Sequence, residues 1–303
     1  MNASVTPVEG GGGRRWGLTD LLLVGMAFIW GINYSVVKYG TQVVDPLAFN
    51  GARTLLASVA LCVAFIFSRA PRLSRRDLLM LLLLGALGNG LYQYLFVEGI
   101  AHSRAGNAAL MLAAAPAFVA LIGRMRGVER VGTHGVIGIA LSIAGIAVIV
   151  FSGSRVGVGE STMFGDLLLL AGCLTWALYN VLLKPYADRL DSVQLSAVTM
   201  VGGTIVLLMA AAPAMLNAPW GSLPPTGWGA MVYSGLGALV LAYFFWYRGV
   251  RLIGPTRTAM YGNLQPVVAL LFAWAALGET PTIYHAVGTV LILGGLLLTR
   301  SQG

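Results

Sequence analysis

Long apolar runs alternate with short polar segments along almost the whole chain. A helix rises about 1.5 Å per residue, so about 20 apolar residues cross roughly 30 Å of hydrocarbon. The runs lack the alternation of polar and apolar positions that marks a barrel strand, so helices are the predicted form. The pattern predicts ten transmembrane helices, at 19–39, 46–68, 77–97, 106–123, 134–152, 164–184, 193–215, 228–247, 257–277 and 283–299.

Composition places the chain among integral membrane proteins. Hydrophobic residues make up 57% and charged residues only 10%, which leaves too little polar surface to cover a soluble globule of 303 residues. The net charge of +8 does not indicate nucleic acid, because the basic residues form short clusters between apolar runs. Such clusters orient helices in a lipid bilayer, which is the predicted partner. Cys62 and Cys173 lie within apolar runs and give no disulfide or metal spacing.

The distribution of Arg and Lys predicts that both termini are cytoplasmic. Residues 1–15, with a run of four glycines, are expected to form a disordered cytoplasmic tail. With the N-terminus inside, most Arg and Lys fall in cytoplasmic segments, and the basic residues left outside are Lys38, Arg104 and Arg155. This asymmetry follows the positive-inside rule for a multi-pass protein.

The chain carries one segment twice. DLLLVGMAFIWGINYSVVK at 20–38 matches DLLLLAGCLTWALYNVLLK at 166–184, and Pro116/Pro266 and Glu129/Glu279 match at an offset of 150 residues. Each half holds five predicted spans, an odd number, so the second half enters the membrane upside down. The predicted units are a five-helix repeat at 16–153 and an inverted five-helix repeat at 160–303, which enclose a central cavity. Chance similarity between apolar helices is the alternative.

The matched helices carry aromatic and polar residues at mid-membrane depth. Trp30 lies ten residues after Asp20, about 15 Å along a helix, and Trp176 follows Asp166 by the same interval. An indole N–H, a phenol or an amide at this depth needs a partner, which a water-filled cavity would supply. Ordinary hydrogen bonding between helices is the alternative. Neighbouring polar and aromatic residues in these two spans are Asn33, Tyr34, Tyr179 and Asn180.

Three further spans extend this set. In the third span Asn89, Tyr92, Gln93 and Phe96 share one helix face by their i, i+3 and i+4 spacing. In the eighth, Tyr243 lies deeper than the aromatic residues at the cytoplasmic end. Pro116 and Pro266 are predicted helix kinks, since proline removes a helical hydrogen bond and frees a carbonyl. Beside the second of these prolines the ninth span carries Tyr261, Asn263 and Gln265.

Several kinds of site are not indicated. No Asp or Glu falls at the centre of a predicted span, which disfavours proton-coupled export of cationic drugs. Arg53 is the deepest clear charge, and a structural role is favoured over substrate binding. The histidines are scattered at span ends without the spacing of metal ligands. The sequence predicts no cofactor and no metal.

This architecture resembles the drug/metabolite transporter superfamily. The resemblance rests on the two inverted halves, on Trp30 and Trp176, on the prolines of spans four and nine, and on LGETPT at 277–282. Within the superfamily the chain resembles the EamA-type exporters and, in motifs such as LYQYLF, the YddG-type amino-acid exporters. This resemblance implies export of aromatic amino acids across the bacterial inner membrane. Members that carry phosphorylated sugars place Lys or Arg in span nine, where this chain has YGNLQP.

The predicted function is secondary transport, by alternating access, of small neutral or zwitterionic metabolites, above all aromatic and other amino acids. Export of other drug-like solutes is the alternative, and an intramembrane enzyme or a receptor is disfavoured because no catalytic constellation is visible at depth. The coupling ion and the oligomeric state stay open, and a monomer is compatible with the pattern. The predicted substrate-binding residues are Trp30, Asn33, Tyr34, Asn89, Tyr92, Gln93, Trp176, Tyr179, Asn180, Tyr243, Tyr261, Asn263 and Gln265.

Overall fold

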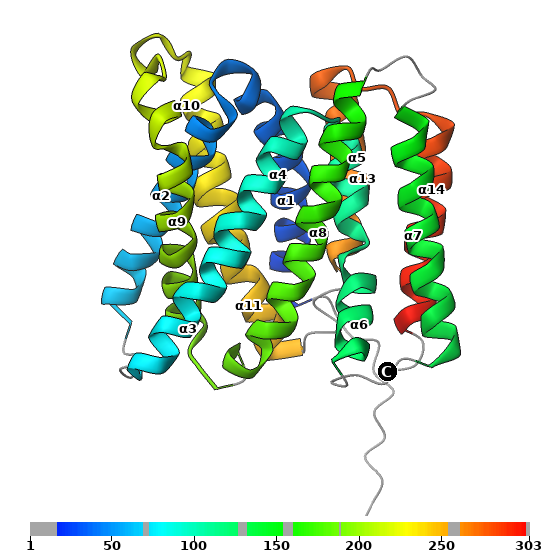
Figure 1. The fold of residues 1–303 in the computed structure, drawn as a ribbon, viewed down its shortest axis with the longest axis horizontal. Coiled ribbons are helices and arrows are strands. Elements are labelled where there is room, and N and C mark those ends of the chain that lie inside the picture. Colours follow the sequence, from blue (N-terminus) through cyan, green and yellow to red (C-terminus); the bar gives the residue numbers. More distant parts are fainter. Residues whose placement is uncertain are drawn as a thin grey trace, which may run out of the picture.

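The computed structural model describes residues 17–68, 73–126, 132–153, 160–187, 189–253 and 261–300. These residues form a bundle of helices that lie side by side, and none of them forms a strand (Figure 1). The all-helical class is therefore confirmed. The helices of the first part of the chain are α1 (Leu18–Val43), α2 (Pro46–Ile66), α3 (Arg75–Gly85), the π-helix η1 (Ala86–Leu91), α4 (Tyr92–Ala101), α5 (Ala105–Ala113), α6 (Ala115–Met125) and α7 (Thr133–Gly153).

The second part continues in the same way. Its elements are α8 (Glu160–Ala187), α9 (Ser192–Asn217), the 3-10 turn η2 (Trp220–Ser222), α10 (Pro225–Val232), the π-helix η3 (Tyr233–Leu241), α11 (Ala242–Ile253), the 3-10 turn η4 (Gly262–Leu264), α13 (Gln265–Leu277) and α14 (Ile283–Arg300).

Seven helical stretches among the described residues are long and apolar enough to cross a bilayer. They are Leu18–Val43, Pro46–Ile66, Arg75–Ala101, Ala105–Gly123, Met163–Ala187, Ser192–Asn217 and Pro225–Trp246. Three shorter apolar helices, Thr133–Ile149, Gln265–Leu277 and Ile283–Gly295, overlap the other three predicted spans. The predicted tail at 1–15 and the start of the ninth span at 257–260 lie outside the described residues. The number of ten spans stays a prediction.

Local sequence explains where several helices begin and break. Asp45 accepts hydrogen bonds from the backbone N–H groups of Leu47 and Ala48, and so satisfies two donors at the start of α2. The fourth predicted span is interrupted at Ala114, two residues before Pro116, because a proline ring cannot fit the preceding helical turn. Pro266 stands in the first turn of α13, where a missing N–H is tolerated.

A matched pair of π-helices is the least expected feature of the fold. η1 ends at Leu91 and η3 at Leu241, positions that correspond at the offset of 150 residues. Each has a close backbone contact, at Gly85 just before η1 and at Gly235 within η3: a Cβ on Gly85 would lie 2.0 Å from the Thr199 carbonyl oxygen, and one on Gly235 would lie 2.8 Å from that of Arg53. These glycines let α3 pack against α9 and η3 against α2. The two parts of the chain therefore interlock. π-helices are rare and occur often at functional sites.

Ser103, between α4 and α5, fixes the relative direction of α1 and α8. Its carbonyl oxygen accepts from Nζ of Lys38, near the C-terminal end of α1, and its hydroxyl donates to Asp166, near the N-terminal end of α8. The two sequence-matched helices therefore run in opposite directions (Figure 1). We call the end of the bundle where these residues meet the Asp166 end, and the opposite end, where α1 begins, the Asp20 end.

Candidate functional site

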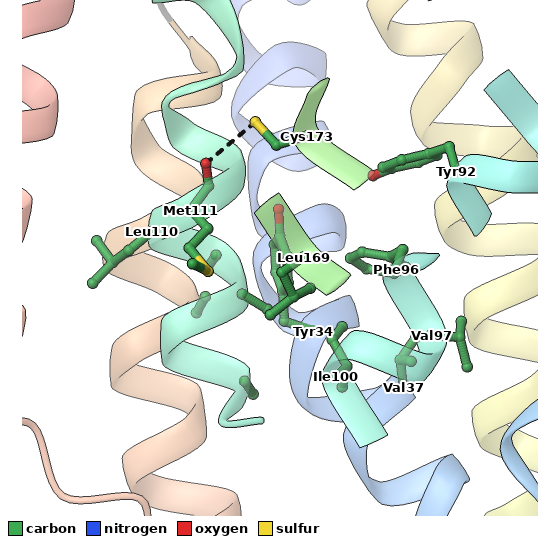
Figure 2. Packing of buried hydrophobic residues seen from close by; sticks show 14 of the residues in the cluster. Tyr34, Val37, Tyr92, Phe96, Val97, Ile100, Leu110, Met111, Leu169 and Cys173 are labelled. Carbon is green, nitrogen blue, oxygen red and sulfur yellow. Dashed lines mark hydrogen bonds between the residues drawn. The ribbon is translucent and has the colours of Figure 1, made fainter. Parts of the chain in front are cut away.

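The first aromatic cluster joins α1, α4 and α8. The ring centroid of Tyr92 lies 4.9 Å from that of Trp176 and 5.7 Å from that of Phe96. Phe96 also packs against Tyr34 at 5.8 Å, and Trp176 against Tyr179 at 5.4 Å. Figure 2 shows Tyr92 and Phe96 beside Tyr34, with Leu169 close by in the same core. Rings from helices far apart in sequence thus form one continuous aromatic wall.

The second aromatic cluster joins α1 to α11. Trp30 packs edge-on against Tyr243 with 5.5 Å between the ring centroids, and against Trp246 at 5.8 Å. The indole N–H of Trp30 donates to the carbonyl oxygen of Ala238, at 2.9 Å. Ala238 lies within the π-helix η3, whose irregular backbone supplies the acceptor. The polar group of this tryptophan is therefore bonded to protein.

A buried polar network lies where α2, α4 and η3 meet. The side chain of Arg53 has no exposed surface. Its Nε donates to Oδ1 of Asn50 at 3.0 Å, its Nη1 to the hydroxyl of Ser234 at 2.8 Å, and its Nη2 to Oε1 of Gln93 at 2.6 Å. The amide of Asn50 in turn donates to the backbone carbonyl of Gln93 at 2.8 Å. The acceptors of this guanidinium among the described residues are all neutral.

The network lies between the two aromatic clusters. The guanidinium carbon of Arg53 is 5.9 Å from the ring centroid of Phe96, which belongs to the first cluster. The second cluster is reached through η3, which carries both Ser234, an acceptor of Arg53, and Ala238, whose carbonyl bonds Trp30. We call the two aromatic clusters and this network together the central site.

The structure brings together about half of the predicted site residues. Those at the central site are Trp30, Tyr34, Tyr92, Gln93, Trp176, Tyr179 and Tyr243. Asn33 is buried next to Tyr34, and its side-chain oxygen has no hydrogen-bond partner among the described residues. An unsatisfied buried amide oxygen is unfavourable, so this atom is suited to accept from a ligand.

The remaining predicted residues have other neighbours. Asn89 packs against the backbone of α9 at Gly203, and the amide of Asn180 donates to the carbonyl of Trp176 in its own helix at 2.7 Å. The hydroxyl of Tyr261 donates to Asp20 at the Asp20 end. Gln265 is half-buried, and its carbonyl oxygen would lie 3.1 Å from a Cβ on Gly31. The side chains of Asn263 and Pro116 lie outside what the structure describes.

The predicted substrate-binding residues left out four members of the central site, which are Asn50, Arg53, Phe96 and Ser234. The sequence places Phe96 on the same face as Tyr92 and Gln93 and favours a structural role for Arg53. A further signal was present for Asn50 and Arg53. Asn50, Arg53 and Thr54 follow i, i+3 and i+4 spacing, so the second predicted span has a polar face that a lipid-exposed helix would not carry. Ser234 carried no such signal, because a single serine is common in transmembrane helices.

A second buried network lies at the Asp166 end. The carboxylate of Asp166 has no exposed surface and accepts from the hydroxyl of Ser103 and from the amide of Asn107, the latter at 3.2 Å to both oxygens. The amide oxygen of Asn107 bonds Nε2 of His285 at 2.9 Å. Lys38 donates to the carbonyls of Ile100, Ala101 and Ser103 at 2.6 to 3.0 Å.

The turn between α13 and α14 completes this network. Glu279 accepts from the backbone N–H groups of Ala105 at 3.0 Å and Gly106 at 3.2 Å, and so caps the N-terminus of α5. Arg104 donates to the carbonyl of Thr280 at 2.8 Å. Polar groups from both parts of the chain thus bond one another across the Asp166 end.

An apolar hollow of about 420 Å³ opens between α6 and α8. Its lining residues are Ile122, Met125, Arg126, Leu174, Thr175 and Leu178. The described residues hold no group of three His, Cys, Asp or Glu that could bind a metal ion. Among the parts of the chain that the structure describes, the chemistry at depth is therefore aromatic stacking and hydrogen bonding around one cation.

Comparison with known proteins agrees with this picture. The model of the EamA-like transporter family matches twice, at residues 17–151 and 163–301. An uncharacterized transporter of Archaeoglobus fulgidus is 30% identical over 286 residues, which cover 94% of this chain and 98% of that protein. A probable terminal-alkyne amino-acid exporter of Streptantibioticus cattleyicolor is 31% identical over 276 residues, 90% of each chain.

Two further likenesses point the same way. An uncharacterized inner membrane transporter of Escherichia coli, YedA, is 29% identical over 267 residues, 85% of this chain and 82% of that one. A solved crystal structure with a TM-score of 0.61 covers 93% of this chain and 96% of its own, at 21% identity, and so shares the fold. The matched proteins are transporters and not enzymes. The chain therefore belongs to the EamA-like transporter family of the drug/metabolite transporter superfamily.

Proposed function

We propose that this transporter exports small neutral or zwitterionic metabolites, above all aromatic amino acids, by alternating access. The observation that carries the proposal is the central site, where aromatic rings from α1, α4, α8 and α11 surround buried hydrogen-bonding groups. Rings stack on an aromatic side chain, while amides and hydroxyls bond amino and carboxyl groups. The relative named as an amino-acid exporter supports the same substrate class.

The proposed topology is ten spans in two inverted five-helix repeats, at 16–153 and 160–303, with both termini in the cytoplasm of a bacterial cell. Support comes from the opposite directions of α1 and α8 and from the matched π-helices. The Asp166 end would then face the outside of the inner membrane. Rocking of the repeats against each other would expose the central site to each side in turn.

Labelling of introduced cysteines tests the topology. In a background without Cys62 and Cys173, single cysteines replace Leu18 and Met163, which are exposed near the starts of α1 and α8. An impermeant maleimide added to intact cells should label Met163→Cys and leave Leu18→Cys unlabelled until the cells are opened. Labelling of both from the same side would contradict the inverted arrangement.

Transport assays test the substrate class. Proteoliposomes that contain the purified protein should take up labelled phenylalanine and tryptophan, and Trp176→Ala should reduce the rate because it removes the ring that stacks on Tyr92. Trp274→Ala is the matched control, since Trp274 is 56% exposed on the outside of α13. Absence of flux for every neutral amino acid tested, threonine included, would contradict the proposal.

A further inference from the structure

Arg53 is a buried cation that no carboxylate contacts among the described residues. Among the residues that the structure describes, the groups that contact its guanidinium are the side chains of Asn50, Gln93 and Ser234 and the ring of Phe96. A cation in the hydrocarbon region is costly, and membrane proteins usually keep such a group where it pairs with an anion or lines a substrate path. The structural role expected from sequence explains three hydrogen bonds and leaves the positive charge without a counter-ion.

The geometry of the guanidinium suits a carboxylate. An arginine side chain carries five N–H donors, of which Arg53 uses three. The two N–H groups of its planar end can bind the two oxygens of one carboxylate in parallel, the arrangement for which arginine is favoured over lysine. The two terminal nitrogens of Arg53 now donate to the hydroxyl of Ser234 and the amide oxygen of Gln93. Both acceptors are neutral, so their replacement by charged carboxylate oxygens would be favourable.

The position of Arg53 matches an aromatic amino acid. Its guanidinium carbon lies 5.9 Å from the ring centroid of Phe96 in the first aromatic cluster, and its partner Ser234 lies in η3, which bonds Trp30 of the second. A ligand whose carboxylate bonds Arg53 would have its side chain within reach of these aromatic walls. The unpartnered side-chain oxygen of Asn33 is available on α1 to accept from an amino group.

We propose that Arg53 binds the carboxylate of the transported solute, in place of the oxygens of Gln93 and Ser234. The site therefore selects aromatic carboxylates and amino acids over amines of the same shape. This inference deepens the proposed function and rests on it for the transported species, but it makes a separate claim about binding. Arg53 is fully buried in this structure, so the exchange of partners belongs to a conformation in which the central site is open.

Ligand binding to the purified full-length protein in detergent tests the proposal. Four probes share one aromatic ring: phenylalanine, 3-phenylpropionate, which lacks the amino group, and phenethylamine and phenylalaninol, which lack the carboxylate. We expect phenylalanine and 3-phenylpropionate to bind, measured by calorimetry or by the rise in melting temperature. The two probes without a carboxylate should bind at least about tenfold more weakly, because a bidentate charge-assisted pair is lost.

Gln93→Glu is the sharpest variant. It places a carboxylate at the position of an atom 2.6 Å from Nη2 of Arg53, so the protein would fill its own anion site. We expect the variant to fold with an unchanged or higher melting temperature and to lose binding of both carboxylate probes. Gln194→Glu makes the same change at a buried glutamine of α9 and serves as the control that should bind normally. Arg53→Lys, which keeps the charge without the planar fork, should weaken carboxylate binding about tenfold.

The outcomes separate this proposal from the proposed function. Binding of phenethylamine as tight as that of phenylalanine, normal binding by Gln93→Glu, or no binding of either carboxylate probe would overturn the role of Arg53, whatever proteoliposomes transport. Binding of 3-phenylpropionate that Gln93→Glu abolishes would support it even if no amino acid is transported. In that case the substrate class of the proposed function would be wrong and the carboxylate site would stand.

Discussion

The matched helices α1 and α8 share a sequence pattern and differ in surroundings. Asp166 is fully buried, whereas Asp20 is partly exposed and accepts from Tyr261 and from the N–H of Gly17. Lys38 is partly buried and donates to three carbonyls, whereas its mate Lys184 is exposed. The residue types at corresponding positions are identical, so the difference arises from the helices around them.

The residues that bond Asp166 show where the two halves diverge. Ser103 and Asn107 donate to it, and the positions that correspond to them at an offset of 150 residues are Ile253 and Arg257. An isoleucine cannot donate a hydrogen bond, and an arginine brings a charge in place of a neutral amide. The two halves therefore diverge in the residues that correspond to the partners of the matched aspartates. In the part of the chain that the structure describes, a buried network closes the Asp166 end, while residues 254–260, which include Arg257, lie outside that part.

Replacing the two matched aspartates should give the largest difference. Asp166→Ala leaves the buried groups of Ser103 and Asn107 without their acceptor and separates two parts of the chain, so we expect a loss of about 2–4 kcal/mol of stability. Asp20→Ala removes a partly exposed acceptor and should lose about 1 kcal/mol. Thermal unfolding of both variants in detergent measures the gap. Equal losses would mean that burial at the Asp166 end does not distinguish the two halves.

The matched lysines should differ less. Lys38→Met keeps the apolar stem but leaves the carbonyls of Ile100, Ala101 and Ser103 without a cation, at a cost of about 1–3 kcal/mol. Lys184→Met, at an exposed position, should change stability by about 0.5 kcal/mol or less. The same unfolding assay compares the two variants. A larger loss of stability at Lys184 would contradict the expectation that Lys38 contributes more.

The positions of the helices could be predicted from sequence because bilayer thickness fixes the length of an apolar run. For example, the third predicted span, 77–97, lies within the continuous helical stretch Arg75–Ala101. The repeat also predicted that Trp30 and Trp176 lie deep in the bundle. Of the two partners that the sequence allows for the Trp30 indole N–H, a water-filled cavity or a neighbouring helix, the structure shows the second, because this N–H bonds the carbonyl of Ala238.

That bond could not be predicted, since hydropathy does not distinguish a π-helix from an α-helix. The acceptor of this bond, the carbonyl of Ala238, lies in η3. The partners of Arg53 were hidden for a related reason. Gln93 and Ser234 are 40 and 181 residues away from it in sequence. Ser234 meets it because the close contact at Gly235 brings η3 against α2, and Gln93 reaches it from α4.

Replacing the matched tryptophans should change stability least. The two replacements should rank in opposite orders for loss of stability and for loss of transport. Trp30→Phe keeps an aromatic ring against Tyr243 but loses the hydrogen bond to Ala238, at a cost of about 1 kcal/mol. Trp176→Phe keeps the contact with Tyr92, and no described residue bonds the Trp176 indole N–H, so stability should change less.

Transport should follow the opposite order, because Trp176 lies in the aromatic wall beside Tyr92 and its indole is free to bond a solute. We therefore expect Trp176→Phe to slow phenylalanine uptake more than Trp30→Phe does, in proteoliposomes that contain equal amounts of folded protein. A stability loss at Trp176→Phe that matches its transport loss would indicate that this indole also supports the fold. The two copies of the repeated segment would then differ in partners and not in role.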